Sequence, residues 1–297
     1  MAGAQEAAVD PPTFRTGVSD VKVDVQVVEN NRIVTGLTQD AFQITDEGQP
    51  QKIVYFGRDA EPLSLVLLLD ISGSMRRWLQ RISSTAREAM GYLRAGDKVA
   101  IMVFGKRVEI HQEFSDNLAE TARQIASAVT DHDVGAGTAI NQSVAVAAEY
   151  MRRHAGPQGR HAILVLTDNL SLSYMFPDEE VIKALYAGDT VLNAIVVGRA
   201  IRPGPAKPGV YQNPDFTPAD VFKLAEETGG EAVRADETDI SFKDMIERIR
   251  TRYSLSYHAP GGAAGRFRHI GVTLTADAKK RYPLAEVRAR HGYYVSE

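Results

Sequence analysis

The pattern of hydrophobic residues changes twice along the chain. Within residues 21–27, valines at every second position alternate with Lys22, Asp24 and Gln26. This two-residue period is typical of a strand with one buried and one solvated face. Beyond residue 62 the apolar residues form unbroken runs instead, at 65–69, 99–104, 162–166 and 191–197. Unbroken runs predict strands that are covered on both faces, as in parallel sheets.

Segments with a helical period separate these runs. They lie at 78–93, 117–130, 139–154, 179–187, 219–228 and 241–253. Strands that alternate with such helices are typical of a doubly wound α/β fold with a mostly parallel sheet. We therefore predict a Rossmann-like α/β domain over residues 61–251.

The two-residue period returns after the last helical segment. Tyr253, Leu255 and Tyr257 alternate with serines, and the segments 269–275 and 286–291 alternate again. Neither end of the chain has enough strands for a stable sandwich, but together they supply about six or seven. We predict one split antiparallel β-sandwich from residues 18–60 and 252–297, with the α/β domain inserted between its halves. Residues 1–17 are expected to be a flexible leader.

Composition narrows the classes of function. The chain has 297 residues and a net charge of −4, and this weak acidity argues against broad binding to nucleic acid. It has no cysteine, which excludes thiol catalysis, disulfides and cysteine-ligated zinc. No stretch approaches the ~20 apolar residues of a membrane span.

Side chains with oxygen ligands follow the first apolar run. The run ends in Asp70, and hydroxyl groups follow at Ser72 and Ser74. In an open α/β sheet, ligands bind beyond the carboxyl ends of the strands. One carboxylate and two hydroxyls are hard oxygen ligands, which suit Mg²⁺ better than a soft metal.

Two more loops bring oxygen atoms to the same predicted edge. Thr138 follows a Gly-Ala-Gly sequence and precedes a helical segment, so it either caps that helix or points its hydroxyl at the same ion. Asp168 follows another buried run. Three strand ends therefore present only Asp, Ser and Thr oxygens.

The set Asp70-x-Ser72-x-Ser74, then Thr138, then Asp168 resembles the metal-ion-dependent adhesion site of von Willebrand factor type A domains. The flanking sequences LTQDAFQITDEGQPQKIVYF and YSLSYHAP look like those of bacterial von Willebrand A-related proteins typified by Acidobacteria. The resemblance extends over nearly the whole chain from about Gly17. Asn169 departs from it, because the family usually has glycine after the aspartate.

The resemblance implies a noncatalytic, metal-dependent protein-binding module. Ser72, Ser74 and Thr138 would coordinate the ion directly, and Asp70 and Asp168 directly or through water. The ion would be Mg²⁺, with Mn²⁺ or Ca²⁺ as alternatives, and an Asp or Glu of a partner protein would complete its coordination. The resemblance also implies an exported protein whose signal peptide precedes this sequence. No partner in the form of nucleic acid is expected.

Two other function classes stay open. The first is a structural or assembly scaffold that has the fold but does not depend on metal. The second is a metal-dependent phosphohydrolase-like enzyme with Asp70 as the nucleophile. Such enzymes use a second Asp two residues later, where this chain has Ser72, so the general acid/base would be missing.

Two loops at the predicted metal edge carry apolar side chains that would suit a protein partner. Tyr174, Met175 and Phe176 lie in the first loop, and Tyr211 and Phe216 lie in the second. The alternative is that these side chains pack back onto their own helices. Elsewhere, Arg288 and Arg290 share one strand face and are expected to line a solvated sheet surface.

Overall fold

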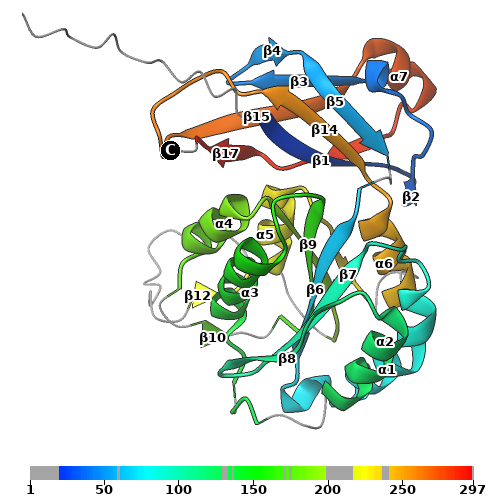
Figure 1. Cartoon of the computed structure of the whole chain (residues 1–297), viewed down its shortest axis with the longest axis vertical. Helices are drawn as coiled ribbons and strands as arrows, with labels where there is room; N and C mark the ends of the chain where they lie inside the picture. The colour runs from blue at the N-terminus through cyan, green and yellow to red at the C-terminus, as the bar shows by residue number, and fades with distance from the viewer. Residues whose placement is uncertain are drawn as a thin grey trace, which may run out of the picture.

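The structure is a computed structural model, and it describes residues 20–58, 61–128, 133–135, 137–169, 172–173, 176–198, 217–235 and 241–295. The middle of the chain, from β6 to α6, forms a unit of helices around a sheet, here called the α/β unit. Both ends of the chain form two antiparallel sheets, here called the sandwich, which lie against one end of the α/β unit (Figure 1). The leader predicted at residues 1–17 lies outside the described residues.

The α/β unit contains a six-stranded sheet in the order β13-β11-β9-β6-β7-β8. All neighbours in it run parallel except β7 and β8, which pair antiparallel. Its strands are β6 (Leu63–Asp70), β7 (Lys98–Phe104), β8 (Val108–Ser115), β9 (Arg160–Thr167), β11 (Thr190–Val196) and β13 (Ala232–Arg234). Every residue of β6 and β9 is buried, as the unbroken apolar runs predict.

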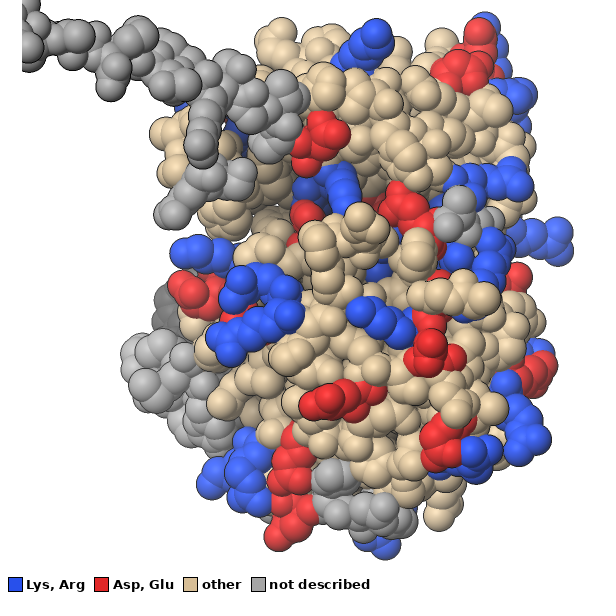
Figure 2. Space-filling model, in the orientation of Figure 1, with Lys and Arg blue, Asp and Glu red and all other residues tan. Residues whose placement is uncertain are grey.

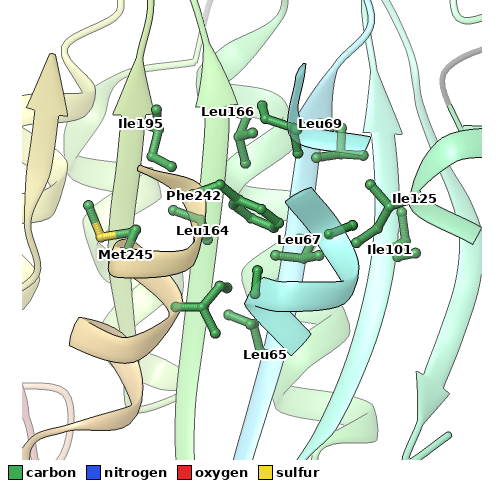
Figure 3. Packing of buried hydrophobic residues seen from close by; sticks show 14 of the residues in the cluster. Leu65, Leu67, Leu69, Ile101, Ile125, Leu164, Leu166, Ile195, Phe242 and Met245 are labelled. Carbon is green, nitrogen blue, oxygen red and sulfur yellow. The ribbon is translucent and has the colours of Figure 1, made fainter. Parts of the chain in front are cut away.

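Six helices cover the two faces of this sheet. One face packs on α1 (Arg76–Met90), α2 (Leu118–Ala128) and α6 (Phe242–Arg250), and the other on α3 (Ile140–His154), α4 (Asp178–Ala187) and α5 (Val221–Thr228). Alternate side chains of β6 serve the two faces, so that Leu65, Leu67 and Leu69 meet Phe242 and Met245 of α6 and their neighbours (Figure 3). The prediction of a doubly wound fold is confirmed.

The sandwich combines strands from both ends of the chain. One sheet has the order β16-β1-β14-β5 with β2 at the side, and the other has the order β17-β15-β3-β4. Their strands are β1 (Asp20–Glu29), β2 (Arg32–Ile33), β3 (Phe42–Asp46), β4 (Gln49–Gln51), β5 (Ile53–Arg58), β14 (Tyr253–His258), β15 (Phe267–Leu274), β16 (Glu286–Arg288) and β17 (Gly292–Tyr294). These nine strands exceed the predicted six or seven, because strands of two or three residues have no readable period. A short helix, α7 (Ala276–Arg281), follows β15.

One core joins the two sheets of the sandwich. The valines of β1 at positions 21, 23, 25 and 27 pack with Ile44 of β3, Leu255 of β14 and Ile270 of β15. β1 pairs directly with β14, so the first and last parts of the chain are adjacent in one sheet. We keep the domain boundaries at 60/61 and 251/252 as a prediction; β6 begins at Leu63 and α6 ends at Arg250.

Buried arginines connect the sandwich to the α/β unit. Arg160, the first residue of β9, donates from Nε to Asp24 Oδ2 of β1 at 2.9 Å. Burial would raise the pKa of Asp24, but the charges of Arg160 and Arg252 outweigh it and hold that pKa below its ordinary value. Arg290 is buried and pairs with Asp189 at 2.5 Å, and Arg288 pairs with Glu231 at 2.7 Å. The prediction of a solvated surface is therefore wrong for Arg290, while Arg288 is half-buried.

Candidate metal site

Asp70 lies at the carboxyl end of β6, the edge of the sheet that faces away from the sandwich (Figure 1). It pairs in register with Phe104 of β7 and is fully buried. Its Oδ1 accepts a hydrogen bond from the Ser72 backbone N–H at 3.0 Å, and its Oδ2 accepts one from Thr167 Oγ1 at 2.8 Å. The carboxylate is therefore held in one orientation by the loop that follows β6 and by the last residue of β9.

Ser72, Ser74 and Asp168 join this cluster. Ser74 lies in a short 3₁₀ helix (Gly73–Met75) and donates to Asp168 Oδ2 at 2.6 Å. The hydroxyl oxygens of Ser72 and Ser74 are 3.2 Å apart. Ser74 is exposed while Asp168 is buried, so the cluster extends from the protein interior to solvent.

Thr138 is brought to the same edge by backbone contacts. The N–H of Ala139, the next residue, donates to Gly105 O at 2.8 Å, and Gly105 follows directly after β7. On the other side, Ile71 N–H donates to Phe104 O at 2.9 Å. The loops after β6 and β7 and the segment before α3 therefore meet. The N-cap residue of α3 is Ala139, one position after Thr138.

The electrostatics of the cluster disfavour an ionised Asp70 without a bound cation. Burial raises the pKa of Asp70 to about 6, hydrogen bonds from Ser72 and Thr167 oppose the rise, and the charge of Asp168 adds to it. Two close carboxylates in a buried place repel each other, and a cation bound between them would reverse this effect.

The sequence of this region also matches a known protein family. Residues 65–170 match the model of the von Willebrand factor type A domain, and they span the strand end at Asp70, Thr138 and Asp168. This stretch of the chain is therefore similar to a von Willebrand factor type A domain. No curated protein matches it in sequence. The finer resemblance to bacterial proteins typified by Acidobacteria stays a prediction.

Several solved structures resemble this chain. Proximal thread matrix protein 1 from the mussel byssus is 14% identical, with 69% of this chain and 51% of that chain covered and a TM-score of 0.50. Another structure of that mussel protein, with zinc in its adhesion-site motif, is 15% identical (69% and 49% covered, TM-score 0.49). BatB from Bacteroides thetaiotaomicron is 20% identical (63% and 97%, TM-score 0.48), and a von Willebrand factor type A protein from Catenulispora acidiphila is 12% identical (96% and 76%, TM-score 0.47). At these identities the likeness concerns the fold alone.

The donor set of this von Willebrand A domain fits a hard divalent cation. Within the described ranges, no group of three or more His, Cys, Asp or Glu side chains is placed to hold a metal. The candidate site does not need one, because it has two carboxylates and completes its donor set with hydroxyl groups. Oxygen ligands of this kind are those that Mg²⁺ accepts while it keeps several waters. The residues therefore fit the ion, and the ligand assignment itself stays a prediction.

Asn169, which departs from the family pattern, has a backbone conformation that favours glycine. Its φ is 54°, in the left-handed region where the family's glycine would have no steric cost. Asparagine adopts this region more readily than most residues with a Cβ atom. Its side chain is buried, and neither its Oδ1 nor its Nδ2 has a hydrogen-bond partner in the structure as described. Buried side-chain amides normally have hydrogen-bond partners. An unpaired one next to Asp168 is therefore consistent with a further polar group binding at this site.

The predicted apolar rim is only partly visible. Phe176 is half-buried and packs against the core formed by α3, α4 and α5, and Asn141 of α3 donates to its carbonyl oxygen at 2.9 Å. Tyr174, Met175, Tyr211 and Phe216 lie outside the described residues. A two-stranded ladder of β10 (Leu172–Ser173) and β12 (Thr217–Pro218) connects the two loops that carry the rim.

Two residues that position the site were missed from the sequence. Thr167 donates to Asp70, and its place at the end of an apolar strand gives no separate signal. Gly105 passes so close to the Thr138 loop that an added Cβ would lie 2.6 Å from Val134 Cγ2 and 2.7 Å from Gly135 O. A glycine directly after a buried strand is the signal that indicates such a close approach.

Proposed function

We propose that this protein is a noncatalytic binding module whose von Willebrand A domain holds Mg²⁺ and captures a carboxylate of a partner protein. The observation that carries the proposal is the hydrogen-bonded cluster of Asp70, Ser72, Ser74 and Asp168, which begins at a buried carboxylate and ends at an exposed hydroxyl. Thr138 lies at the same edge. Mn²⁺ and Ca²⁺ are alternatives to Mg²⁺.

In this proposal each residue has a distinct task. Ser72, Ser74 and Thr138 would supply neutral oxygen ligands, and the Ser74 hydroxyl donates its proton to Asp168 Oδ2 at 2.6 Å. Asp70 and Asp168 supply negative charge, directly or through water. Thr167 and the Ser72 N–H keep the Asp70 carboxylate in place. When bound, the ion supplies open positions where a partner's Asp or Glu replaces water.

The same cluster also gives the scaffold alternative its support. The hydrogen bond from Ser74 to Asp168 connects the two loops without any ion, so the edge has a closed arrangement of its own. A scaffold of this kind would bind its partner equally well in chelator. The enzyme alternative lacks a corresponding observation, since Ser72 stands where a phosphohydrolase would need its second carboxylate.

The proposal includes export from the cytoplasm, which rests on the family resemblance alone. None of the helices in the described ranges combines the length and apolar content that a membrane crossing needs. The face in Figure 2 shows Lys and Arg interspersed with Asp and Glu rather than a continuous basic field. On this face, nucleic acid would find no continuous positive surface.

Water proton relaxation with Mn²⁺ as the probe tests the metal site and its open positions together. Chelator-stripped protein should enhance the relaxation on binding Mn²⁺, and a capped Gly-Asp-Gly peptide should lower the enhancement by displacing bound water. Ser74→Ala should weaken Mn²⁺ binding roughly tenfold, as loss of one ligand does. Ser84→Ala is the matched control, because Ser84 is an exposed serine whose hydroxyl donates to Arg81 O within α1. Equal losses in both variants, or no enhancement with the unmodified protein, would contradict the proposal.

A further inference from the structure

The first turn of α1 carries positive charge, which is unfavourable at the amino end of a helix. The amino end of a helix is the positive end of its dipole, so Asp and Glu stabilise it and cations destabilise it by about 0.3–1 kcal/mol each. The first turn of α1 has no acidic residue and begins with Arg76 and Arg77, both exposed. Local features that lower stability without a structural gain are expected at functional sites.

A second pair of cations lies in the turn between β7 and β8. Lys106 and Arg107 are both exposed. The backbone N–H of Arg107 donates to Val134 O at 2.9 Å, and its guanidinium donates to Asp133 O at 2.6 Å. The Cβ of Lys106 lies 3.3 Å from where a Cβ on Gly135 would be. This turn therefore packs on the segment that leads to Thr138.

Both pairs border the candidate metal site. Arg76 follows Ser74 by two positions, and Lys106 follows Gly105, whose carbonyl oxygen accepts from the residue after Thr138. We call Arg76, Arg77, Lys106 and Arg107 the basic rim.

The charge of the basic rim is only partly balanced nearby. None of its members forms an ion pair with an acidic residue of the described chain. In residues 105–110 and in the described part of residues 133–138, the acidic residues are Glu109 and Asp133. Glu109 is half-buried, and the Asp133 carboxylate accepts from the Gly135 N–H. Exposed cations without acidic partners keep their charge available to a docking surface.

We infer that the partner presents a cluster of acidic side chains, in which one carboxylate meets the ion and its neighbours meet the basic rim. This inference rests on the proposed function. Charges at the edge of an interface mainly raise the association rate and make binding depend on salt. The affinity for such a partner should therefore fall steeply as salt shortens the Debye length.

Two capped peptides of equal length test the inference. One has a single Asp among Gly and Ser, and the other has the same Asp with two Glu on each side. With Mg²⁺ present, the acidic peptide should bind at least about tenfold tighter in roughly 50 mM NaCl, and the ratio should shrink in roughly 200 mM NaCl. Substituting all four residues of the basic rim by Gln should bring the acidic peptide to the affinity of the single-Asp peptide. The matched control substitutes four exposed cations of the sandwich by Gln, namely Arg266, Lys279, Lys280 and Arg281.

The outcomes separate this inference from the proposed function. If both peptides bind equally and only with Mg²⁺, the inference is overturned and the proposed function stands. If neither binds the unmodified protein in Mg²⁺, the proposed function itself is overturned. If the acidic peptide binds as tightly in chelator, or if the sandwich control loses as much affinity as the rim variant, the attraction is a general one and the inference is overturned.

Discussion

Substitution of Asp70 by asparagine separates the electrostatic cost of the candidate site from its affinity for metal. Asp70 is fully buried, and burial raises its pKa from 3.8 to about 6. That difference corresponds to roughly 3 kcal/mol by which the metal-free folded state disfavours the ionised carboxylate at neutral pH. An asparagine avoids this cost. It loses about 1 kcal/mol, because a single carbonyl oxygen replaces the two oxygens that accept from Ser72 and Thr167.

The sign of the pH dependence follows from the direction of the shift. The folded protein holds the Asp70 proton more tightly than the unfolded chain does, since the folded pKa is the higher one. The contribution of the protonated group to stability is therefore present at about pH 4 and is lost as pH rises through about 6. Mg²⁺ should restore the lost stability, because bound cations stabilise the folded state that binds them.

Urea unfolding in chelator measures the effect. At about pH 7.5 the Asp70→Asn variant should have a free energy of unfolding about 2 kcal/mol above that of the unmodified protein, and at about pH 4 the advantage should vanish. With Mg²⁺ added, the unmodified protein should gain stability and the variant should not. A variant that is less stable than the unmodified protein in chelator at neutral pH would refute the electrostatic reasoning.

Three further substitutions test the loop before α3, the conformation of Asn169 and the contact between the sandwich and the α/β unit. Gly105→Ala should weaken Mg²⁺ binding about tenfold in a titration, because its Cβ would displace the Thr138 loop; Gly261→Ala, with nothing within 4 Å of the added Cβ, should leave binding unchanged. Asn169→Ala should lower stability by roughly 1 kcal/mol because φ is 54°, and Asn169→Gly should not; equal effects in thermal unfolding would contradict the left-handed conformation. Arg160→Ala should cost about 3 kcal/mol in urea unfolding, the low end for a buried ion pair, because the half-buried Asp24 loses this partner and keeps Ser254, while the Mg²⁺ affinity of the folded protein stays the same.

The pattern of hydrophobic residues along the chain predicted the central strands and the helices of the α/β unit. The apolar run at 65–69 and its equivalents became buried strands because parallel strands between two helical layers contact no water. The edge strand β8 was missed. Its residues are half-buried or exposed in no regular order, and its pairing with β7 shifts register twice. The end of α1 was placed at residue 93 and lies at Met90, where Gly91 follows.

The sandwich shows what a two-residue hydrophobic period cannot predict. A two-residue period says that one face of a strand is polar, but not what lies against that face. Arg290 lies between β16 and β17, where the sandwich meets the α/β unit, so it is buried and paired with Asp189. Pairs between residues this far apart in sequence cannot be read from local pattern.

For the candidate site, the sequence predicted the residue types and their shared edge. Asp70, Ser72, Ser74 and Asp168 share one hydrogen-bonded cluster because strand ends of a parallel sheet converge. The role of Thr167 depends on the register between β9 and β6, which no local pattern shows. The basic rim was equally hidden, since its two halves come from separate loops.

Calorimetric titration of the chelator-stripped protein with Mg²⁺ measures directly whether the Asp70 cluster binds a metal ion. The unmodified protein should bind one ion saturably, and Asp70→Ala should abolish the signal. Asp116→Ala is the matched control, because Asp116 is an exposed carboxylate of the same α/β unit beyond β8. This control should bind Mg²⁺ as the unmodified protein does. Absence of Mg²⁺ binding by the unmodified protein at about millimolar metal, or unchanged binding by folded Asp70→Ala, would refute the metal site.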